Sequence, residues 1–273
     1  MDKKPTLGFS PDVIQFGMPN SPLRIFITGA SSGIGEALAR QYALTRGVQL
    51  GLVARRTDFL ERLQNELDPR PEIYVCDVRD ADGLKAAAQD FITKFGVPDI
   101  VIANAGVSRG TLTEIEGDLK TFQEIFDINV MGMVNTFHAF AEPMKDAKRG
   151  TLVGIASVAG FRGIPGGGAY SASKAACIRY CESLRVEMRS SGVSVVTICP
   201  GYIRTPMTAV NKFKMPFLID VDQAVARFQR AIDAKASFTV IPWTMGVAAR
   251  VLRMVPNWLM TVFFLACHAS PDS

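Results

Sequence analysis

The most constraining feature of this sequence is a regular alternation of short apolar segments with longer stretches of helical spacing. The apolar segments cover residues 23–27, 48–53, 73–76, 100–103, 151–156, 193–199 and 238–241. They are largely continuous apolar runs, a pattern typical of strands that are covered on both faces. The helical stretches lie at residues 34–46, 58–67, 81–95, 119–144, 169–191 and 221–234. This order predicts an α/β fold with a doubly wound, Rossmann-type parallel sheet of about seven strands and helices on both faces.

The length of 273 residues suits one domain, and neither an internal repeat nor an interdomain linker is visible. We expect an irregular N-terminal arm at residues 1–22, a Rossmann-fold domain at 23–242 and an apolar tail at 243–273. The arm has no continuous apolar stretch after its lysines, so it does not match a signal peptide. The sequence contains no run of about 20 apolar residues, so we expect no transmembrane helix.

Charge and cysteine content argue against two classes of function. The net charge is only +4 and no run of Lys or Arg stands out, so nucleic-acid binding is not expected. No metal site is expected either, because the five cysteines form no CxxC pair and there are only two histidines. Cys177 and Cys181 are four residues apart and would share a helix face as buried thiols. Free thiols suit a reducing, cytoplasmic compartment.

A glycine-rich turn at residues 28–35, Thr-Gly-Ala-Ser-Ser-Gly-Ile-Gly, joins the first strand to the first helix. Gly29 would permit the tight turn, Gly33 would let the backbone approach a pyrophosphate, and Gly35 would let helix and strand pack closely. The helix N-terminus offers free N–H groups to phosphates. An ordinary glycine loop is the alternative, but the position after the first strand favours a dinucleotide site. We place three more residues of the turn there: Ser31, Ser32 and Ile34.

The end of the second strand indicates which dinucleotide binds. An NAD site usually has an acidic residue here, which binds the ribose 2′-hydroxyl. This chain has Arg55 and Arg56 instead, and guanidinium groups pair well with a 2′-phosphate. Two solvated surface arginines would be the alternative. With the glycine turn upstream, the pair predicts NADP(H) rather than NAD(H).

Further motifs follow in an order that resembles the short-chain dehydrogenase/reductase family. They are Asp77-Val78 after the third strand, Asn104-Ala105-Gly106 after the fourth, and the segment 200–205 after the sixth. The resemblance covers residues 23–241, and its one small departure is Ala103, where Asn is common. It implies that Asp77 contacts the adenine and that segment 200–205 closes over the nicotinamide. From that segment we assign Pro200, Gly201, Ile203 and Thr205 to the cofactor site.

The resemblance also implies four catalytic residues: Asn129, Ser157, Tyr170 and Lys174. Tyr170 and Lys174 are four apart in a helical stretch and so share one face, where the ammonium favours the phenolate form. Tyr170 would donate a proton to a carbonyl oxygen as hydride reaches the carbon, and Ser157 would hold that oxygen. By resemblance, Tyr170 and Lys174 also belong to the cofactor site, Lys174 binds the nicotinamide ribose, and Asn129 positions a water beside Lys174.

An apolar stretch after the sixth strand indicates what kind of substrate binds. Residues 205–220 resemble the family's mobile lid, and their apolar side chains would form a wall for a bulky or lipid-like substrate. Packing of this stretch on the core or on another subunit is an equal alternative. These side chains are Met207, Val210, Phe213, Met215, Phe217 and Leu218.

The tail after residue 242 carries Arg250 and Arg253 and is interrupted by Pro256. It could cover the substrate pocket, lie on a membrane surface or pack within an oligomer. We favour the oligomer over peripheral membrane contact.

These observations predict an NADP(H)-dependent oxidoreductase that interconverts a ketone or aldehyde and an alcohol. A non-catalytic NADP(H) sensor is the alternative, but Ser157, Tyr170 and Lys174 are all retained. A sugar-nucleotide epimerase or dehydratase would need a larger C-terminal domain. The stretch 119–144 is apolar on more than one face, which predicts a homodimer or homotetramer.

Overall fold

The computed structural model of the protein describes residues 22–211 and 214–268. The predicted N-terminal arm therefore lies outside the described residues except for its last position. The same holds for Phe213 of the predicted lid and for the last five residues of the tail.

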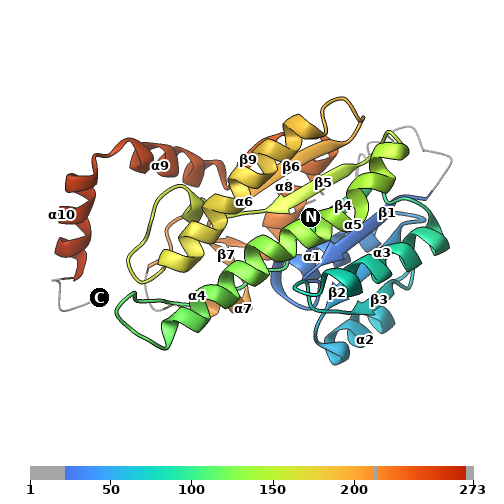
Figure 1. Cartoon of the computed structure of the whole chain (residues 1–273), viewed down its shortest axis with the longest axis horizontal. Helices are drawn as coiled ribbons and strands as arrows, with labels where there is room; N and C mark the ends of the chain where they lie inside the picture. Colours follow the sequence, from blue (N-terminus) through green and yellow to red (C-terminus); the bar gives the residue numbers. More distant parts are fainter. Residues whose placement is uncertain (1–21, 212–213, 269–273) are drawn as a thin grey trace, which may run out of the picture.

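A seven-stranded sheet forms the centre of the molecule, with strand order β3-β2-β1-β4-β5-β6-β9 (Figure 1). Every neighbouring pair is parallel. The prediction of a doubly wound parallel sheet of about seven strands is confirmed. The strands are β1 Arg24–Thr28, β2 Gln49–Ala54, β3 Glu72–Val75, β4 Ile100–Ala103, β5 Thr151–Ile155, β6 Ser194–Pro200 and β9 Phe238–Ile241.

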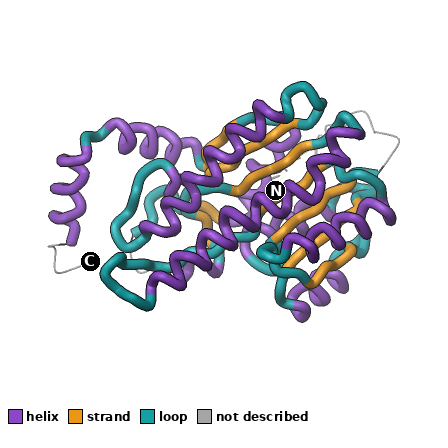
Figure 2. Tube along the Cα trace, in the orientation of Figure 1, coloured by secondary structure: helices purple, strands orange, loops and turns teal. Residues whose placement is uncertain are grey.

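Helices cover both faces of this sheet, and each face has its own apolar core (Figure 2). Continuous apolar strands such as β1 and β4 send side chains into both cores, which explains why their sequences do not alternate. On one face lie α1 Gly33–Ala43, α2 Thr57–Glu66 and α8 Val221–Asp233. On the other lie α3 Ala81–Phe95, α5 Gly132–Asp146 and α6 Gly168–Glu187.

The direction in which successive strands are added to the sheet reverses between β1 and β4. From β1 the order runs outward to β2 and β3 on one side, and to β4, β5, β6 and β9 on the other. The loops that leave the carboxyl ends of β1 and β4 therefore turn to opposite faces and leave a crevice between them. Ligands of open α/β sheets bind in this crevice.

The sequence predicted one regular helix over residues 119–144, and this prediction is wrong for the middle of the segment. The segment consists of α4 Asp118–Phe126, a π-helical turn at Asp127–Met131, and α5. A π turn inserts an extra residue into the helix and is frequently found at functional sites. Here the widened turn contains Asn129, which is completely buried.

A small two-stranded parallel sheet, which the sequence did not predict, closes the base of the lid segment. It pairs β7 Ile203–Arg204 with β8 Ile219–Asp220, and Arg204 forms a 2.8 Å ion pair with Asp220. Between these strands, α7 Pro206–Ala209 is capped by Thr205. The two ends of the segment 205–220 are thus fastened to each other, and Ile203 and Ile219 pack in the core of the domain.

The tail forms two helices, α9 Trp243–Met254 and α10 Asn257–His268, and Pro256 lies between them as expected. In Figure 1 they extend from the end of β9 away from the sheet. Over the part of the chain that the structure describes, none of the helices has the length and apolarity needed to cross a membrane.

Candidate active site

A cavity of about 430 Å³ opens at the carboxyl edge of the sheet, at the crevice between β1 and β4. It is lined by every residue that the sequence assigned to cofactor binding except Gly35, and by three of the four predicted catalytic residues. The catalytic residue outside the lining is Asn129. The motifs come from six different strand ends, and the parallel sheet brings them to one edge.

The glycine turn is held closely against the loop after β4. A Cβ on Gly29, whose φ is +70°, would lie 2.7 Å from the Cα of Ala105. A Cβ on Gly35 would lie 2.2 Å from the carbonyl oxygen of Gly29. The Nδ2 of Asn104 donates to the carbonyl oxygens of Thr28 and Gly29, both at 3.1 Å. Gly35 is therefore a close-packing glycine, and Asn104 fixes the shape of the turn.

The start of α1 fits a phosphate group. Ser32 is the N-cap residue, yet its side chain makes no capping hydrogen bond, so it leaves the first-turn N–H groups without a side-chain acceptor. Ser32, Gly33 and Ile34 all line the cavity, and Gly33 has a φ of +59°. A helix N-terminus in this state is a ready anion site. The observed turn therefore suits the pyrophosphate of a dinucleotide.

Arg56 is held beside this turn by two contacts. Its Nη2 donates to the hydroxyl of Ser31 at 3.0 Å and to the carbonyl oxygen of Ser31 at 3.3 Å. Its guanidinium lies over the ring of Phe59, 3.9 Å from the centroid. The guanidinium thus has a defined place on the cavity wall, where it adds positive charge next to the N-terminus of α1.

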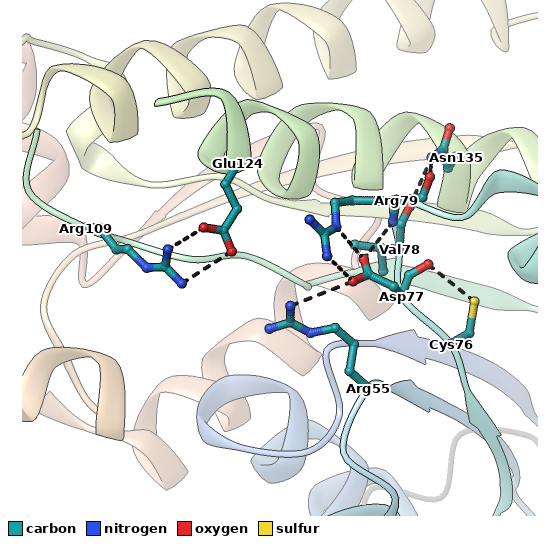
Figure 3. Close-up of polar contacts among 8 residues, drawn as sticks. All are labelled: Arg55, Cys76, Asp77, Val78, Arg79, Arg109, Glu124 and Asn135. Carbon is teal, nitrogen blue, oxygen red and sulfur yellow. Dashed lines mark hydrogen bonds and ion pairs between the residues drawn. The ribbon is translucent and has the colours of Figure 1, made fainter. Parts of the chain in front are cut away.

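Asp77 lies between two guanidinium groups, those of Arg55 and Arg79 (Figure 3). Arg79 donates to both carboxylate oxygens, at 2.7 and 3.0 Å, and Arg55 lies 3.7 Å away. The hydrogen bonds from Arg79, with the attraction of Arg55, hold the pKa of Asp77 below its usual value. Asp77 is therefore an ionised acceptor on the cavity wall, and Arg79 is a partner that the motif reading missed.

Two further contacts in Figure 3 fasten the cavity rim to the long helix. Arg109, in the loop after β4, pairs with Glu124 of α4. Asn135 of α5 donates to the carbonyl oxygen of Val78 at 3.0 Å. These partners are 15 and 57 residues apart in the sequence, so no local pattern could have indicated them.

Ser157, Tyr170 and Lys174 line the same cavity. Ser157 follows β5, and its Oγ accepts a 3.1 Å hydrogen bond from the backbone N–H of Ala159. Lys174 is only 4% exposed; its Nζ donates to the carbonyl oxygen of Ile155 at 2.9 Å and lies 5.9 Å from the ring centroid of Tyr170. Among the described residues, no carboxylate pairs with Lys174. The site therefore contains a hydroxyl, a phenol and a buried cation.

Asn129 lies behind these groups and connects two loops. Its Oδ1 accepts from the backbone N–H of Val107 at 2.8 Å, and its Nδ2 donates to the carbonyl oxygen of Val107 and to Ser173, both at 3.0 Å. Ser173 in turn donates to the carbonyl oxygen of Tyr170 at 2.8 Å. Asn129 thus ties the loop after β4 to the helix that carries Tyr170. Its side chain acts here as a positioning group.

We expect Asn129→Ala to lower the free energy of unfolding by about 3 kcal/mol, because it leaves buried partners of several hydrogen bonds unsatisfied. Urea denaturation would measure this loss. Asn135→Ala is the matched control, since Asn135 is partly exposed and bonds mainly to one carbonyl. Equal destabilisation by the two substitutions would contradict the assigned role of Asn129.

The cysteines near the site are neutral thiols. Cys177, Cys181 and Cys199 are free and buried, as expected for the first two, and Cys76 is a free, partly buried thiol. Burial raises the pKa of Cys181 and of Cys199 to about 12. Such thiols are poor nucleophiles near neutral pH. The side chain of Cys267 lies outside the described residues.

The sequence reading missed several residues that line the cavity. Some belong to strands and loops next to the motifs, and two belong to α7 in the lid segment. Met207 of the same helix was named from the sequence as part of an apolar wall, and it lines the cavity. A position at or near a strand end could have indicated most of the missed residues. They are Ala54, Cys76, Val107, Ile128, Ile155, Ala156, Pro206 and Thr208.

Comparison with known proteins identifies the family. The model of the short chain dehydrogenase family matches residues 24–215. An uncharacterized oxidoreductase of Myxococcus xanthus is 40% identical over 237 residues, which cover 85% of this chain and 92% of the relative. The 11-beta-hydroxysteroid dehydrogenase-like 4A of Arabidopsis thaliana is 33% identical over 246 residues, or 89% of this chain and 79% of the relative.

The fold agrees with these matches. A crystal structure of a short-chain dehydrogenase from Streptomyces avermitilis superposes with a TM-score of 0.76 at 25% identity, covering 90% of this chain and 99% of that one. The family match spans the glycine turn, Tyr170 and Lys174. The chain belongs to the short-chain dehydrogenase/reductase family of oxidoreductases.

Proposed function

We propose that this protein is an NADP(H)-dependent oxidoreductase that interconverts a ketone or aldehyde and the corresponding alcohol. The observation that supports this most is the convergence of Ser157, Tyr170 and Lys174 on the cavity that also contains the glycine turn. A non-catalytic NADP(H) sensor would need only the dinucleotide half of this cavity. The presence of an acid, a hydroxyl and a buried cation in the other half favours catalysis.

The proposed chemistry assigns one task to each side chain. The bound nicotinamide ring would supply the hydride for carbonyl reduction and accept it in alcohol oxidation. As the carbonyl carbon gains hydride, Tyr170 donates its hydroxyl proton to the substrate oxygen. The ammonium of Lys174 stabilises the resulting phenolate, which takes a proton from solvent to complete the cycle. Ser157 accepts from Ala159, so its own O–H remains able to donate to the substrate oxygen.

The preference for NADP(H) rests on Arg55 and Arg56. Both line the cavity at the end of β2, where an NAD site usually has an acidic residue. Arg56 is already oriented by Ser31 and Phe59, so it loses little freedom when it binds a phosphate. Arg55 can turn from its long contact with Asp77 toward the same group. Two guanidinium groups at this position favour a 2′-phosphate.

We expect Arg55→Asp to weaken NADPH binding by about tenfold or more, and NADH binding much less, because the new charge repels only the 2′-phosphate. Arg56→Ala should shift the same ratio, since it removes a charged hydrogen-bond donor. Fluorescence titration with both cofactors measures the ratio of dissociation constants. Arg46→Asp, an exposed change outside the cavity, is the control. If NADH binds as tightly as NADPH to the unmodified protein, the preference is wrong.

The lid segment supports an apolar substrate. Met207 lines the cavity and is exposed, and Val210 and Phe217 are also exposed, so these side chains are not simply part of the core. An apolar ligand would cover them on binding. The name of the Arabidopsis relative, 11-beta-hydroxysteroid dehydrogenase-like 4A, suggests a bulky apolar substrate class.

A panel of carbonyl compounds tests this function directly. NADPH absorbance would be followed with short polar aldehydes, long-chain aldehydes and steroid ketones. We expect the highest kcat/KM with the bulky apolar members. No NADPH oxidation with any member, together with tight NADPH binding, would instead favour the sensor. Faster turnover of the short polar aldehydes would contradict the apolar substrate class.

A further inference from the structure

The C-terminal arm, defined as α9 and α10, contains both tryptophans of the chain. Trp243 is 73% exposed and Trp258 is 69% exposed, although Trp is usually well buried. Val247, Val251 and Met254 are exposed too, and their spacing from Trp243 places all four on one face of α9. Figure 1 shows the arm extending from the body of the domain. The arm thus presents a stripe of large apolar side chains to the surroundings.

The charged side chains of the arm are all positive. From residue 242 to 270 the sequence has no Asp or Glu, whereas Arg250 and Arg253 lie on α9. Arg250 follows Trp243 by seven residues, so it borders the apolar stripe. Both arginines are exposed and line a cavity of about 530 Å³ between α6 and α9. Neither arginine forms an ion pair with any residue that the structure describes.

The orientation of the arm is held by the domain. Gly246 and Ala249 of α9 are buried, and a Cβ on Gly246 would lie 3.0 Å from the Cβ of Val240 in β9. Arg162 donates to the carbonyl oxygen of Val255 at 2.9 Å and to Oδ1 of Asn257 at 3.0 Å. The apolar stripe therefore cannot turn inward without breaking these contacts.

Arg162 also connects the arm to the candidate active site. It lies in the loop between Ser157 and Tyr170, which carries the exposed Ile164. The exposed lid residue Met207 lines the cavity of that site. The arm is thus fastened to a loop that joins two residues of the site.

We propose that this arm docks the protein on the surface of an anionic lipid bilayer. Amphipathic helices with an apolar stripe and flanking arginines lie in the interface, and Trp prefers this depth. Arg250 and Arg253 would pair with lipid phosphates, which supply the anionic partners absent from the arm. Contact between the arms of two copies is disfavoured, because it would place arginines together without an acidic residue in either arm to pair with them.

Intrinsic tryptophan fluorescence tests this docking without a label, because both tryptophans report on the arm. The full-length protein would be titrated with vesicles of phosphatidylcholine alone and with vesicles of equal parts phosphatidylcholine and phosphatidylglycerol. We expect a blue shift of the emission and co-sedimentation with the anionic vesicles, both reduced by high salt. Brominated acyl chains should quench the emission.

Two pairs of variants separate charge from apolar contact. Arg250→Glu/Arg253→Glu should weaken binding to anionic vesicles by about tenfold or more. Arg46→Glu/Arg189→Glu makes the same charge change at exposed positions elsewhere and should bind normally. Val251→Ser/Met254→Ser should reduce the blue shift, whereas Leu44→Ser/Val186→Ser should not, although Leu44 and Val186 are also largely exposed.

Three outcomes would overturn the proposal. The first is no blue shift and no co-sedimentation with anionic vesicles. The second is equal binding by the Arg250→Glu/Arg253→Glu variant and its control. The third is a dimer, measured by light scattering, that Val251→Ser/Met254→Ser dissociates while vesicles do not bind, since the stripe would then be covered by a second copy. None of these readouts requires turnover, so they are independent of the proposed oxidoreductase activity.

Discussion

Tyr170→Phe is expected to lower kcat by about 10²- to 10⁴-fold while the fold and NADPH binding remain. The substitution removes only the hydroxyl, which is the group that donates the proton in the proposed reaction. The hydrogen bond from Ser173 to the Tyr170 backbone stays intact, so α6 keeps its position. Because the hydroxyl acts in the transition state, kcat should fall far more than substrate binding weakens. Steady-state kinetics with a verified carbonyl substrate measures this loss.

Tyr180→Phe is the matched control, because it makes the same change on the same helix. Tyr180 packs against Phe137 at a centroid distance of 6.2 Å and does not line the cavity. Burial raises its pKa to about 12, so it is a neutral phenol near pH 7. This variant should turn over normally. Near-normal kcat of Tyr170→Phe would show that another group protonates the substrate, and equal losses in both variants would indicate a structural effect.

Gly35→Ala is expected to lower the free energy of unfolding by about 3 kcal/mol or more, and to abolish NADPH binding. The new methyl group would lie 2.2 Å from the carbonyl oxygen of Gly29 and 2.5 Å from Nδ2 of Asn104. Gly29 belongs to the turn and Asn104 braces it from the loop after β4, so neither can move without breaking the hydrogen bonds between them. Urea denaturation and NADPH fluorescence would measure the two effects.

Gly117→Ala provides the comparison for this substitution. A Cβ on Gly117 would meet nothing within 4 Å, and its φ of −62° is accessible to any residue. This variant should be as stable as the unmodified protein and bind NADPH normally. If Gly35→Ala proved no less stable than Gly117→Ala, the close packing of α1 on the glycine turn would not be essential.

The location of the site could be predicted because its residues follow strand ends. Gly29 follows β1, Arg55 follows β2, Asp77 follows β3, Asn104 follows β4 and Ser157 follows β5. In a parallel sheet the carboxyl ends of all strands lie at one edge. Motifs that each follow a strand are therefore expected to meet in a common cavity. Tyr170 and Lys174 were added from the family resemblance, and their helical spacing is consistent with it, because residues four apart share a helix face.

Other features could not be read from local patterns. The π turn at Asp127–Met131 has the same apolar spacing as a regular helix. It is distinguished by its backbone hydrogen bonding, in which the N–H of Gly132 donates to the carbonyl oxygen of Asp127. The pairing of Asp77 with both arginines likewise required the loops to be placed in space. The small sheet β7–β8 has strands of two residues, too short to show a period.

The sequence by itself determined the seven strands of the main sheet, most of the helices that cover it, its two covered faces and the edge at which the motifs meet, because these depend on local periodicity and on the geometry of parallel sheets. The tertiary structure alone decided which residues brace the site and which remain exposed. Asn129 connects the loop after β4 to α6, Ser31 orients Arg56, and Trp243 is exposed. Each of these outcomes depends on how segments distant in sequence are placed in space, and local periodicity carries no information about that.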